Sequence, residues 1–212
     1  MNSFLILLLS TISRGADEPR FVLIQPTYSV SGHGAVLDDL ESRMPAQHPY
    51  RDRDRITWAH ETTHGLNSYI RNRLGPRKQS LYVLEGRCVV LDEPSHIRLG
   101  DVARAVPQSE RGQVYNLYLV QQQRDWDDTP TYVLDEWIAY VNGAKCGQEL
   151  GLDYGSEVGF AREFTNYARA LERIARSPEI TAYVRWQESE VARLLPPRTV
   201  GSRVYVKPWR RR

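Results

Sequence analysis

The run His60-Glu61-Thr62-Thr63-His64 constrains this chain more than any other stretch does. Two histidines four residues apart lie one turn apart on the same face of an α-helix, so both imidazoles can reach one metal ion. The glutamate between them can reach a water bound to that metal and take its proton. The chain must therefore form a helix here and supply a further ligand, because catalytic zinc normally takes three protein ligands.

Chance explains this pattern poorly. With average use of histidine and glutamate, a random chain of this length contains the pattern on the order of 0.5% of the time. The pattern also falls inside an amphipathic helix predicted over 55–74, which the chemistry requires. The ordinary alternative is a helix with two histidines that face solvent and bind no metal.

The ends of the helix predicted over 55–74 are marked in the sequence. Asp54 can cap its start, and Gly75-Pro76 is a stop signal. Gly65 inside the helix costs about 1 kcal/mol relative to alanine. That cost indicates a packing reason, such as the close approach of another backbone.

Asn67 lies three residues after His64, near the same face of the helix. It is either a hydrogen-bonding group behind the metal ligands or a solvated helix residue. The zinc motif that uses a third histidine needs a glycine at this position and a histidine three residues later, where the chain has Ile70. That class of zinc site is therefore excluded.

A glutamate on a second helix is the remaining source of a third ligand, and Glu136 is the best candidate. It lies early in a helix predicted over 131–144, and a glutamate buried among apolar neighbours is costly unless a cation pairs with it. The ordinary alternative is that Asp135 and Glu136 are first-turn acids favoured by the helix dipole. Asp135 could also orient a histidine through the other ring nitrogen.

Other residues are open candidates for roles around this site. The weaker candidates for the third ligand are Glu149, Asp153 and Glu157. A hydrolytic site also needs a donor for the tetrahedral oxyanion. Tyr132 and Tyr140 each lie one turn from Glu136, and we predict Tyr140 as the catalytic donor. His33, in a glycine-flanked turn, and His96 are the other candidates.

The rest of the chain predicts an α+β domain, in which a short sheet packs on the motif helix and the C-terminal half is mainly helical. Strands are predicted over 21–24, 81–84, 87–91, 114–121 and 203–206, and further helices over 35–44, 97–105, 156–175 and 178–194. Residues 125–130 are predicted to form an acidic loop, and Ser156 and Ser177 to cap the last two helices. The run 87–91 is either a substrate-binding edge strand or a core strand.

Length and composition restrict the class of protein. A chain of 212 residues is long enough for one domain with its own core. Its formal net charge of +2 argues against nucleic-acid binding. Cys88 and Cys146 permit one disulfide, or they are two small buried hydrophobic residues.

The N-terminus bears on localisation. Residues 4–9 form an apolar run that is too short to span a bilayer, which needs about 20 residues. The run is typical of a signal peptide, predicted over 1–16, although no Lys or Arg precedes it. Residues 17–212 then form a single domain that is secreted or periplasmic, without stable membrane insertion. The alternative is a buried first strand or helix in a cytoplasmic protein.

The motif from His60 to His64, followed by a helical glutamate in Asp135-Glu136-Trp-Ile-Ala-Tyr140, resembles the gluzincin class of zinc metallopeptidases. The second motif is also similar to the catalytic domains of anthrax-lethal-factor-like peptidases. The resemblance covers two helices. It implies a small zincin-like fold, peptide-bond hydrolysis, and a strand edge above the zinc that holds an extended substrate.

Together these observations predict a zinc endopeptidase that acts on a peptide or protein substrate. Zinc held by His60, His64 and Glu136 activates water, and Glu61 is the general base. The alternatives are a zinc hydrolase of another amide, such as a cell-wall cross-link, and a non-catalytic peptidase-like binding domain. The intact Glu61 counts against the last alternative, because a purely structural site does not need it.

Overall fold

The structure is a computed structural model that describes residues 9–12 and 18–194. The strand predicted over 203–206 and most of the signal peptide predicted over 1–16 lie outside these residues. The described chain is an α+β fold with one antiparallel sheet and a mainly helical remainder, as predicted.

The sheet has the strand order β1-β2-β4-β3, and all neighbouring strands are antiparallel. Its strands are β1 (Leu9–Ile12), β2 (Phe21–Leu23), β3 (Lys78–Tyr82) and β4 (Arg87–Asp92). Strand β1 falls within the predicted signal peptide, which stays a prediction. Strand β4 is an inner strand, so its backbone hydrogen-bonds to a neighbour on each side.

The hairpin of β3 and β4 begins earlier than predicted. Strand β3 starts at Lys78 rather than at Leu81, and Gln79 and Ser80 pair with β4 and are buried. Polar residues that are buried leave no apolar alternation in the sequence. The period of hydrophobic residues therefore located only the second half of this strand.

Helix α2 (Arg55–Leu74) has the bounds predicted from the sequence. The Asp54 side chain accepts a hydrogen bond from an amide of the first turn at 3.1 Å, and Gly75 follows the last turn at φ 97°. A Cβ added at Gly65 would lie 3.0 Å from the terminal carbon of Met44. The neighbour of Gly65 is therefore a side chain, and the predicted approach of another backbone is wrong.

Helix α5 (Tyr132–Leu150) packs across α2 and is buried along most of its length. It continues beyond the end predicted at Ala144 to a left-handed cap at Gly151, where φ is 66°. A side chain at Gly147 would collide with the Cβ atom of Tyr154, which lies shortly after α5 in the chain, and then with Ile56 of α2. This glycine therefore permits close packing inside the helix and does not end it.

The remaining helices surround this pair. Helices α1 (Ala35–Arg43), α3 (Leu99–Ala105), α6 (Gly155–Ala175) and α7 (Pro178–Arg193) agree with prediction, whereas α4 (Gln123–Trp126) and a 3-10 turn (Gln108–Glu110) were not predicted. Ser177 caps α7 through its side chain, as predicted. Ser156 does not cap α6, because that helix begins one residue earlier. Helix α4 takes up the first part of the predicted acidic loop over 125–130.

The strand predicted over 114–121 is wrong. Residues Asn116–Gln121 form a π-helix, η2. Alternation would have buried Leu117 together with Tyr115 and Leu119, but Leu117 is 39% exposed while the other two are buried. The apparent period of two was therefore a coincidence within a helical segment. A π-helix in an otherwise α-helical region is frequently found at a functional site.

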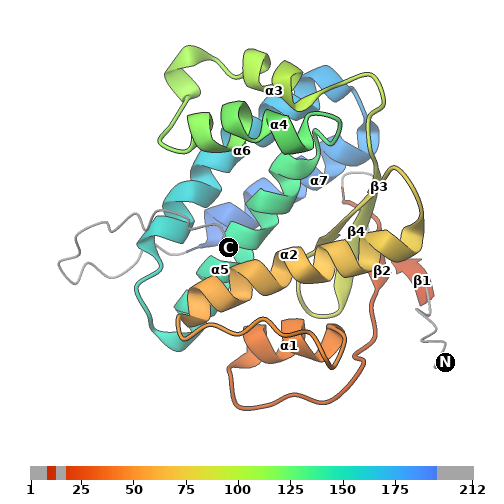
Figure 1. Cartoon of the computed structure of the whole chain (residues 1–212), viewed down its shortest axis with the longest axis vertical. Helices are drawn as coiled ribbons and strands as arrows, with labels where there is room; N and C mark the ends of the chain where they lie inside the picture. The colour runs from red at the N-terminus through yellow and green to blue at the C-terminus, as the bar shows by residue number, and fades with distance from the viewer. Residues whose placement is uncertain (1–8, 13–17, 195–212) are drawn as a thin grey trace.

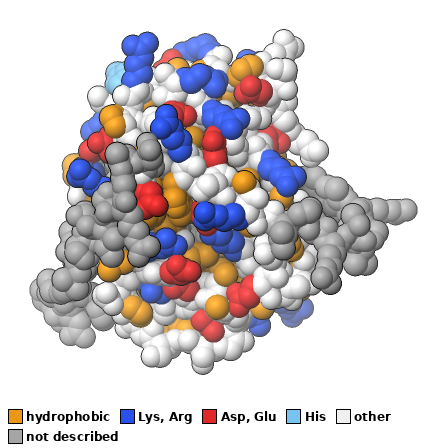
Figure 2. Space-filling model, turned by 180° about the vertical axis from the view of Figure 1, so that it is seen from behind, with side chains coloured by type: hydrophobic (Ala, Val, Ile, Leu, Met, Phe, Trp, Pro, Cys, Tyr) orange, Lys and Arg blue, Asp and Glu red, His pale blue; other side chains and the backbone are white. Residues whose placement is uncertain are grey.

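The elements form two packed groups around the crossing of α2 and α5. Figure 1 shows α2 lying across α5, with the sheet beside the C-terminal half of α2 and α1 beneath it. One hydrophobic cluster joins α5 to α3, α6 and α7, and a second joins α2 to α1 and the hairpin. On the face seen in Figure 2, basic and acidic side chains are interspersed. Among the described helices, none combines the length and the apolar character needed to cross a membrane.

Cys88 and Cys146 are free thiols, and both are buried. The disulfide that the sequence permitted is not formed, so these residues act as small hydrophobic core residues. Burial raises the pKa of each thiol to about 12. Only a trace of thiolate, the reactive form, is therefore present near neutral pH.

We expect neither Cys88 nor Cys146 to react with Ellman's reagent in the folded protein at about pH 8, because both thiols are buried and protonated. After unfolding in guanidinium chloride without reductant, both should react. Rapid reaction of the folded protein, or a missing thiol after unfolding, would contradict this arrangement.

Candidate metal centre

His60 and His64 project from one face of α2 toward a common point. Their Nε2 atoms lie 3.2 Å apart, and their ring planes are inclined by 71°. Glu136 reaches the same point from α5. Its Oε2 atom lies 3.6 Å from Nε2 of His64 and 3.9 Å from Nε2 of His60. The sequence-predicted triad is thus assembled from the two helices that cross at the centre of the fold.

These distances fit the ligand atoms of one tetrahedral ion. An ion about 2.0–2.1 Å from each ligand atom places those atoms about 3.3–3.4 Å apart. The three separations of 3.2, 3.6 and 3.9 Å bracket that spacing. His60, His64 and Glu136 could therefore hold a metal ion after small side-chain adjustments.

The environment of Glu136 supports the same conclusion. Its side chain is 9% exposed, and its Oε2 atom is buried without a hydrogen-bond partner among the described residues. A buried carboxylate oxygen with no partner is costly. A cation between Oε2 and the two imidazole nitrogens would remove that cost.

A second carboxylate lies behind each histidine. Nδ1 of His64 is 3.0 Å from Oδ2 of Asp135, and Nδ1 of His60 is 3.4 Å from Oε2 of Glu157. A carboxylate that accepts the Nδ1 hydrogen leaves the Nε2 lone pair free to bind a metal. Asp135 occupies the orienting position predicted for it. Glu157, predicted as a weaker alternative ligand, instead contacts the ring nitrogen of His60 that faces away from Glu136.

In the absence of a metal ion, the carboxylates around His64 favour its protonated, positively charged form. Burial alone lowers the pKa of His64, but the carboxylates of Asp135 and Glu136 outweigh it and raise the pKa well above its usual value. A proton on this imidazole competes with a metal ion for Nε2. Metal binding should therefore release a proton from the centre.

Asn67 is buried and belongs to this network. Its Nδ2 atom donates to Oδ1 of Asp135 at 2.5 Å, and its Oδ1 atom accepts from the amide of Tyr82 at 2.7 Å. Of the two interpretations of Asn67 left open by the sequence, the solvated residue is wrong. The amide lies behind the metal ligands, in contact with the carboxylate that orients His64.

Glu61 lies beside the centre with a partly exposed side chain. Within residues 18–194, no donor binds its carboxylate. Tyr50 lies in the segment before α2. Its pKa is raised mainly by burial, and the negative charge of Glu61 is the next largest cause. Glu61 also contributes to the raised pKa of Tyr118, after burial and the charges of Glu136 and Glu157. Its carboxylate is therefore available to accept a proton from a water molecule.

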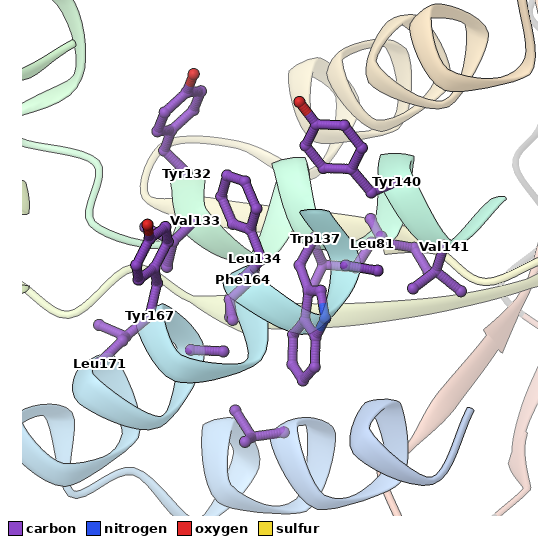
Figure 3. Packing of buried hydrophobic residues seen from close by; sticks show 14 of the residues in the cluster. Leu81, Tyr132, Val133, Leu134, Trp137, Tyr140, Val141, Phe164, Tyr167 and Leu171 are labelled. Atoms are coloured by element: carbon purple, nitrogen blue, oxygen red, sulfur yellow. The ribbon is translucent and has the colours of Figure 1, made fainter. Parts of the chain in front are cut away.

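Three tyrosines surround the triad, and one of them was missed in the sequence. Figure 3 shows the hydroxyls of Tyr132 and Tyr140 pointing away from the packed core. The Tyr140 ring packs edge-on against His60 at 4.5 Å, and its hydroxyl lies 2.6 Å from that of Tyr118. Tyr118 comes from η2, and the incorrect strand assignment there hid it. No local pattern marks it, because only the tertiary fold brings η2 to α5.

The other predicted site residues lie elsewhere. Nδ1 of His33 contacts Asp38 at 3.2 Å, and the His33 ring packs on Trp58, while His96 is exposed in a turn before α3. Two of the weaker ligand candidates bind backbone amides instead: Glu149 binds the amides of Ala35 and Val36 at the start of α1, and Asp153 binds that of Gly155. None of these four belongs to the metal-binding group found among the described residues.

The strand edge that the resemblance implied is already occupied at Tyr82, on the outer strand β3. Residues 87–91 belong to the inner strand β4, so their interpretation as an edge strand is wrong and they form a core strand. On β3, the amide of Tyr82 donates to Asn67, and its carbonyl accepts from Nδ2 of Asn142 at 3.0 Å. The outward backbone groups of Tyr82 are thus bound to α2 and α5.

No known protein-family model, curated protein or solved structure matches this chain. The chemistry and geometry of its own residues therefore support the metal centre.

We expect the replacements Asp135→Asn and Glu157→Gln to weaken zinc binding, because each removes a carboxylate that holds a histidine. Outer groups of this kind typically contribute about 10–100-fold in metal affinity. Asp135→Asn should have the larger effect, because Oδ2 of Asp135 lies 3.0 Å from Nδ1 of its histidine, whereas Oε2 of Glu157 lies 3.4 Å from Nδ1 of the other.

The measurement is a zinc titration in competition with a fluorescent chelator. Glu149→Gln is the matched control, because Glu149 is a carboxylate on α5 that binds only backbone amides of α1. Equal zinc affinity in the parent and in both test variants would show that these carboxylates do not orient the ligands.

Proposed function

We propose that this protein is a zinc-dependent hydrolase of peptide bonds, similar to the gluzincin metallopeptidases. The observation that carries the proposal is the buried Oε2 atom of Glu136, which lacks a hydrogen-bond partner among the described residues and faces the Nε2 atoms of His60 and His64. Two imidazoles and one carboxylate are a known ligand set of catalytic zinc, which keeps a fourth position for water or substrate. Zinc bound there would lower the pKa of a water molecule and polarise an amide carbonyl.

Glu61 is the proposed general base. It follows His60 directly on α2, its side chain is partly exposed, and no described residue donates to its carboxylate. A carboxylate with these properties can take a proton from water and later deliver it to the leaving amine. A site that only stabilises the fold would gain nothing from Glu61, which favours an enzyme over a binding domain.

The hydroxyl pair of Tyr118 and Tyr140 is the proposed donor to the oxyanion. Their oxygens are 2.6 Å apart, so one hydroxyl donates to the other and one hydrogen stays available. The Tyr140 ring packs on His60, which keeps the pair beside the centre. This proposal retains the predicted Tyr140 and adds Tyr118 from η2.

The substrate and the compartment belong to the same proposal. We propose a peptide or protein substrate in a secreted or periplasmic setting, on the basis of the apolar run over 4–9. Another amide, such as a cell-wall cross-link, remains the second candidate, because hydrolysis of any amide uses the same groups. A quenched fluorescent peptide library and purified cell wall, tested in parallel, distinguish the two substrates.

The variants Glu61→Gln and Glu136→Ala should separate chemistry from metal binding. Glu61→Gln should keep about one equivalent of zinc and lose about 10²–10⁴-fold in kcat, the usual contribution of a general base. Glu136→Ala should lose zinc as well as activity, because it removes a ligand. The checks are metal analysis by mass spectrometry and cleavage of the peptide library.

Each of these two variants controls for the other. Full zinc content in Glu136→Ala would mean that the third ligand is misassigned. Unchanged turnover in Glu61→Gln would remove the basis for assigning Glu61 as the base.

Tyr118→Phe should lower kcat about 10²-fold while zinc content and KM change little, because an oxyanion donor acts mainly in the transition state. Tyr69→Phe is the control, since Tyr69 lies on α2 with Arg73 over its ring. If Tyr118→Phe retains the parent kcat, Tyr118 has no role in the reaction.

A further inference from the structure

Asn67 connects the metal centre to the sheet. It is fully buried on α2, three residues after His64. Its side chain accepts a hydrogen bond from the amide of Tyr82 on β3 and donates one to Asp135 on α5. Its own carbonyl accepts from the hydroxyl of Ser80 at 2.6 Å. One residue therefore joins three elements that meet behind the histidines.

The orientation of the Asn67 amide follows from its partners. The Tyr82 amide can only donate, and the Asp135 carboxylate can only accept when ionised. The Asn67 oxygen must therefore face β3 and its nitrogen must face α5. An ionised carboxylate at this position has no donor for Asp135, and an aliphatic side chain has neither a donor nor an acceptor, so neither can serve both partners.

The two oxygens of Asp135 have separate partners. Oδ1 accepts from Asn67 at 2.5 Å, and Oδ2 lies 3.0 Å from Nδ1 of His64. Fixing Oδ1 fixes the rotation of the carboxylate, and that rotation sets the direction in which Oδ2 holds the imidazole. The plane of the His64 ring, and with it the direction of its Nε2 lone pair, is thereby tied to the backbone of β3.

We propose that Asn67 is a positioning residue of the metal centre, which locks the Asp135 carboxylate and through it the His64 imidazole to the backbone of strand β3. This inference rests on the proposed metal site. Its functional consequence is that the sheet, which contributes no ligand, determines how well His64 is preorganised for the ion.

The variant Asn67→Asp breaks the proposed contact by placing a carboxylate beside that of Asp135. It keeps an oxygen that can accept from Tyr82 and removes the donor to Asp135. Zinc affinity should fall about 10-fold, the lower end for outer-sphere partners. The visible absorption bands of the cobalt-substituted protein should also change, because a displaced imidazole alters the ligand geometry.

The double variant Asn67→Asp/Asp135→Asn reverses the donor and the acceptor. The new amide on α5 can donate to the new carboxylate on α2 and can still accept from Nδ1 of His64. Because Asp135→Asn alone already weakens zinc binding, the double variant should bind zinc no more weakly than Asp135→Asn alone, so the two losses should not add. A role of Asn67 that is independent of Asp135 predicts additive losses instead.

Asn142→Asp is the matched control. Asn142 is also fully buried and binds the backbone of Tyr82, through the carbonyl, but it contacts Thr63 rather than Asp135. This variant should lower the unfolding temperature while its zinc affinity and cobalt spectrum stay near those of the parent. An equal loss of zinc affinity in Asn142→Asp and Asn67→Asp would overturn the proposal, because general loosening would then explain both.

The outcomes separate this inference from the proposed function. A parent protein that binds no zinc contradicts the metal site itself. A parent that binds zinc, with unchanged affinity and spectrum in Asn67→Asp, contradicts only the role of Asn67. Should Asn67→Asp fail to fold, the parent still tests the idea by ¹⁵N NMR. The side-chain amide signal of Asn67 should then shift on zinc addition, and an unmoved signal would contradict the proposal.

Discussion

The packing of α5 across α2 is the contact on which the metal centre depends. The two histidines belong to α2, and the only carboxylate that the described residues bring to both Nε2 atoms, Glu136, belongs to α5. The start of α5 is itself fixed by Glu93, which follows β4 and accepts hydrogen bonds from the amide and hydroxyl of Thr131. The hairpin therefore fixes the start of α5, and the packing of α5 on α2 places the Glu136 side chain beside the two histidines.

Local signals explain what the sequence could predict. The bounds of α2 followed from the cap at Asp54 and the stop at Gly75, which act within one turn of the helix ends. Glu136 could be predicted because the motif supplies only two metal ligands, so an acidic residue on another helix had to provide the third. Tyr118 and the contact of Glu157 with His60 could not be predicted, since both arise where distant elements pack. The strand wrongly predicted over 114–121 shows how a short apolar run imitates alternation when its neighbours are unknown.

The surroundings of the centre also restrict how a substrate can approach. Strand β4 is internal, and the outward groups of Tyr82 on β3 are bound by two asparagines, one from α2 and one from α5. Pairing of an extended peptide at this point would require breaking both contacts. The partly exposed side is instead the one where Glu61 lies near Tyr50 and Tyr118. A substrate of the proposed hydrolase would therefore approach from the side of Glu61.

The most direct test of the metal centre is a crystal structure of the zinc-loaded protein, with anomalous data collected at the zinc edge. We expect one strong anomalous peak between α2 and α5, about 2.0–2.2 Å from Nε2 of His60, Nε2 of His64 and a carboxylate oxygen of Glu136. A peak bound by other residues, or one that leaves Glu136 beyond bonding distance, would contradict the proposed metal centre.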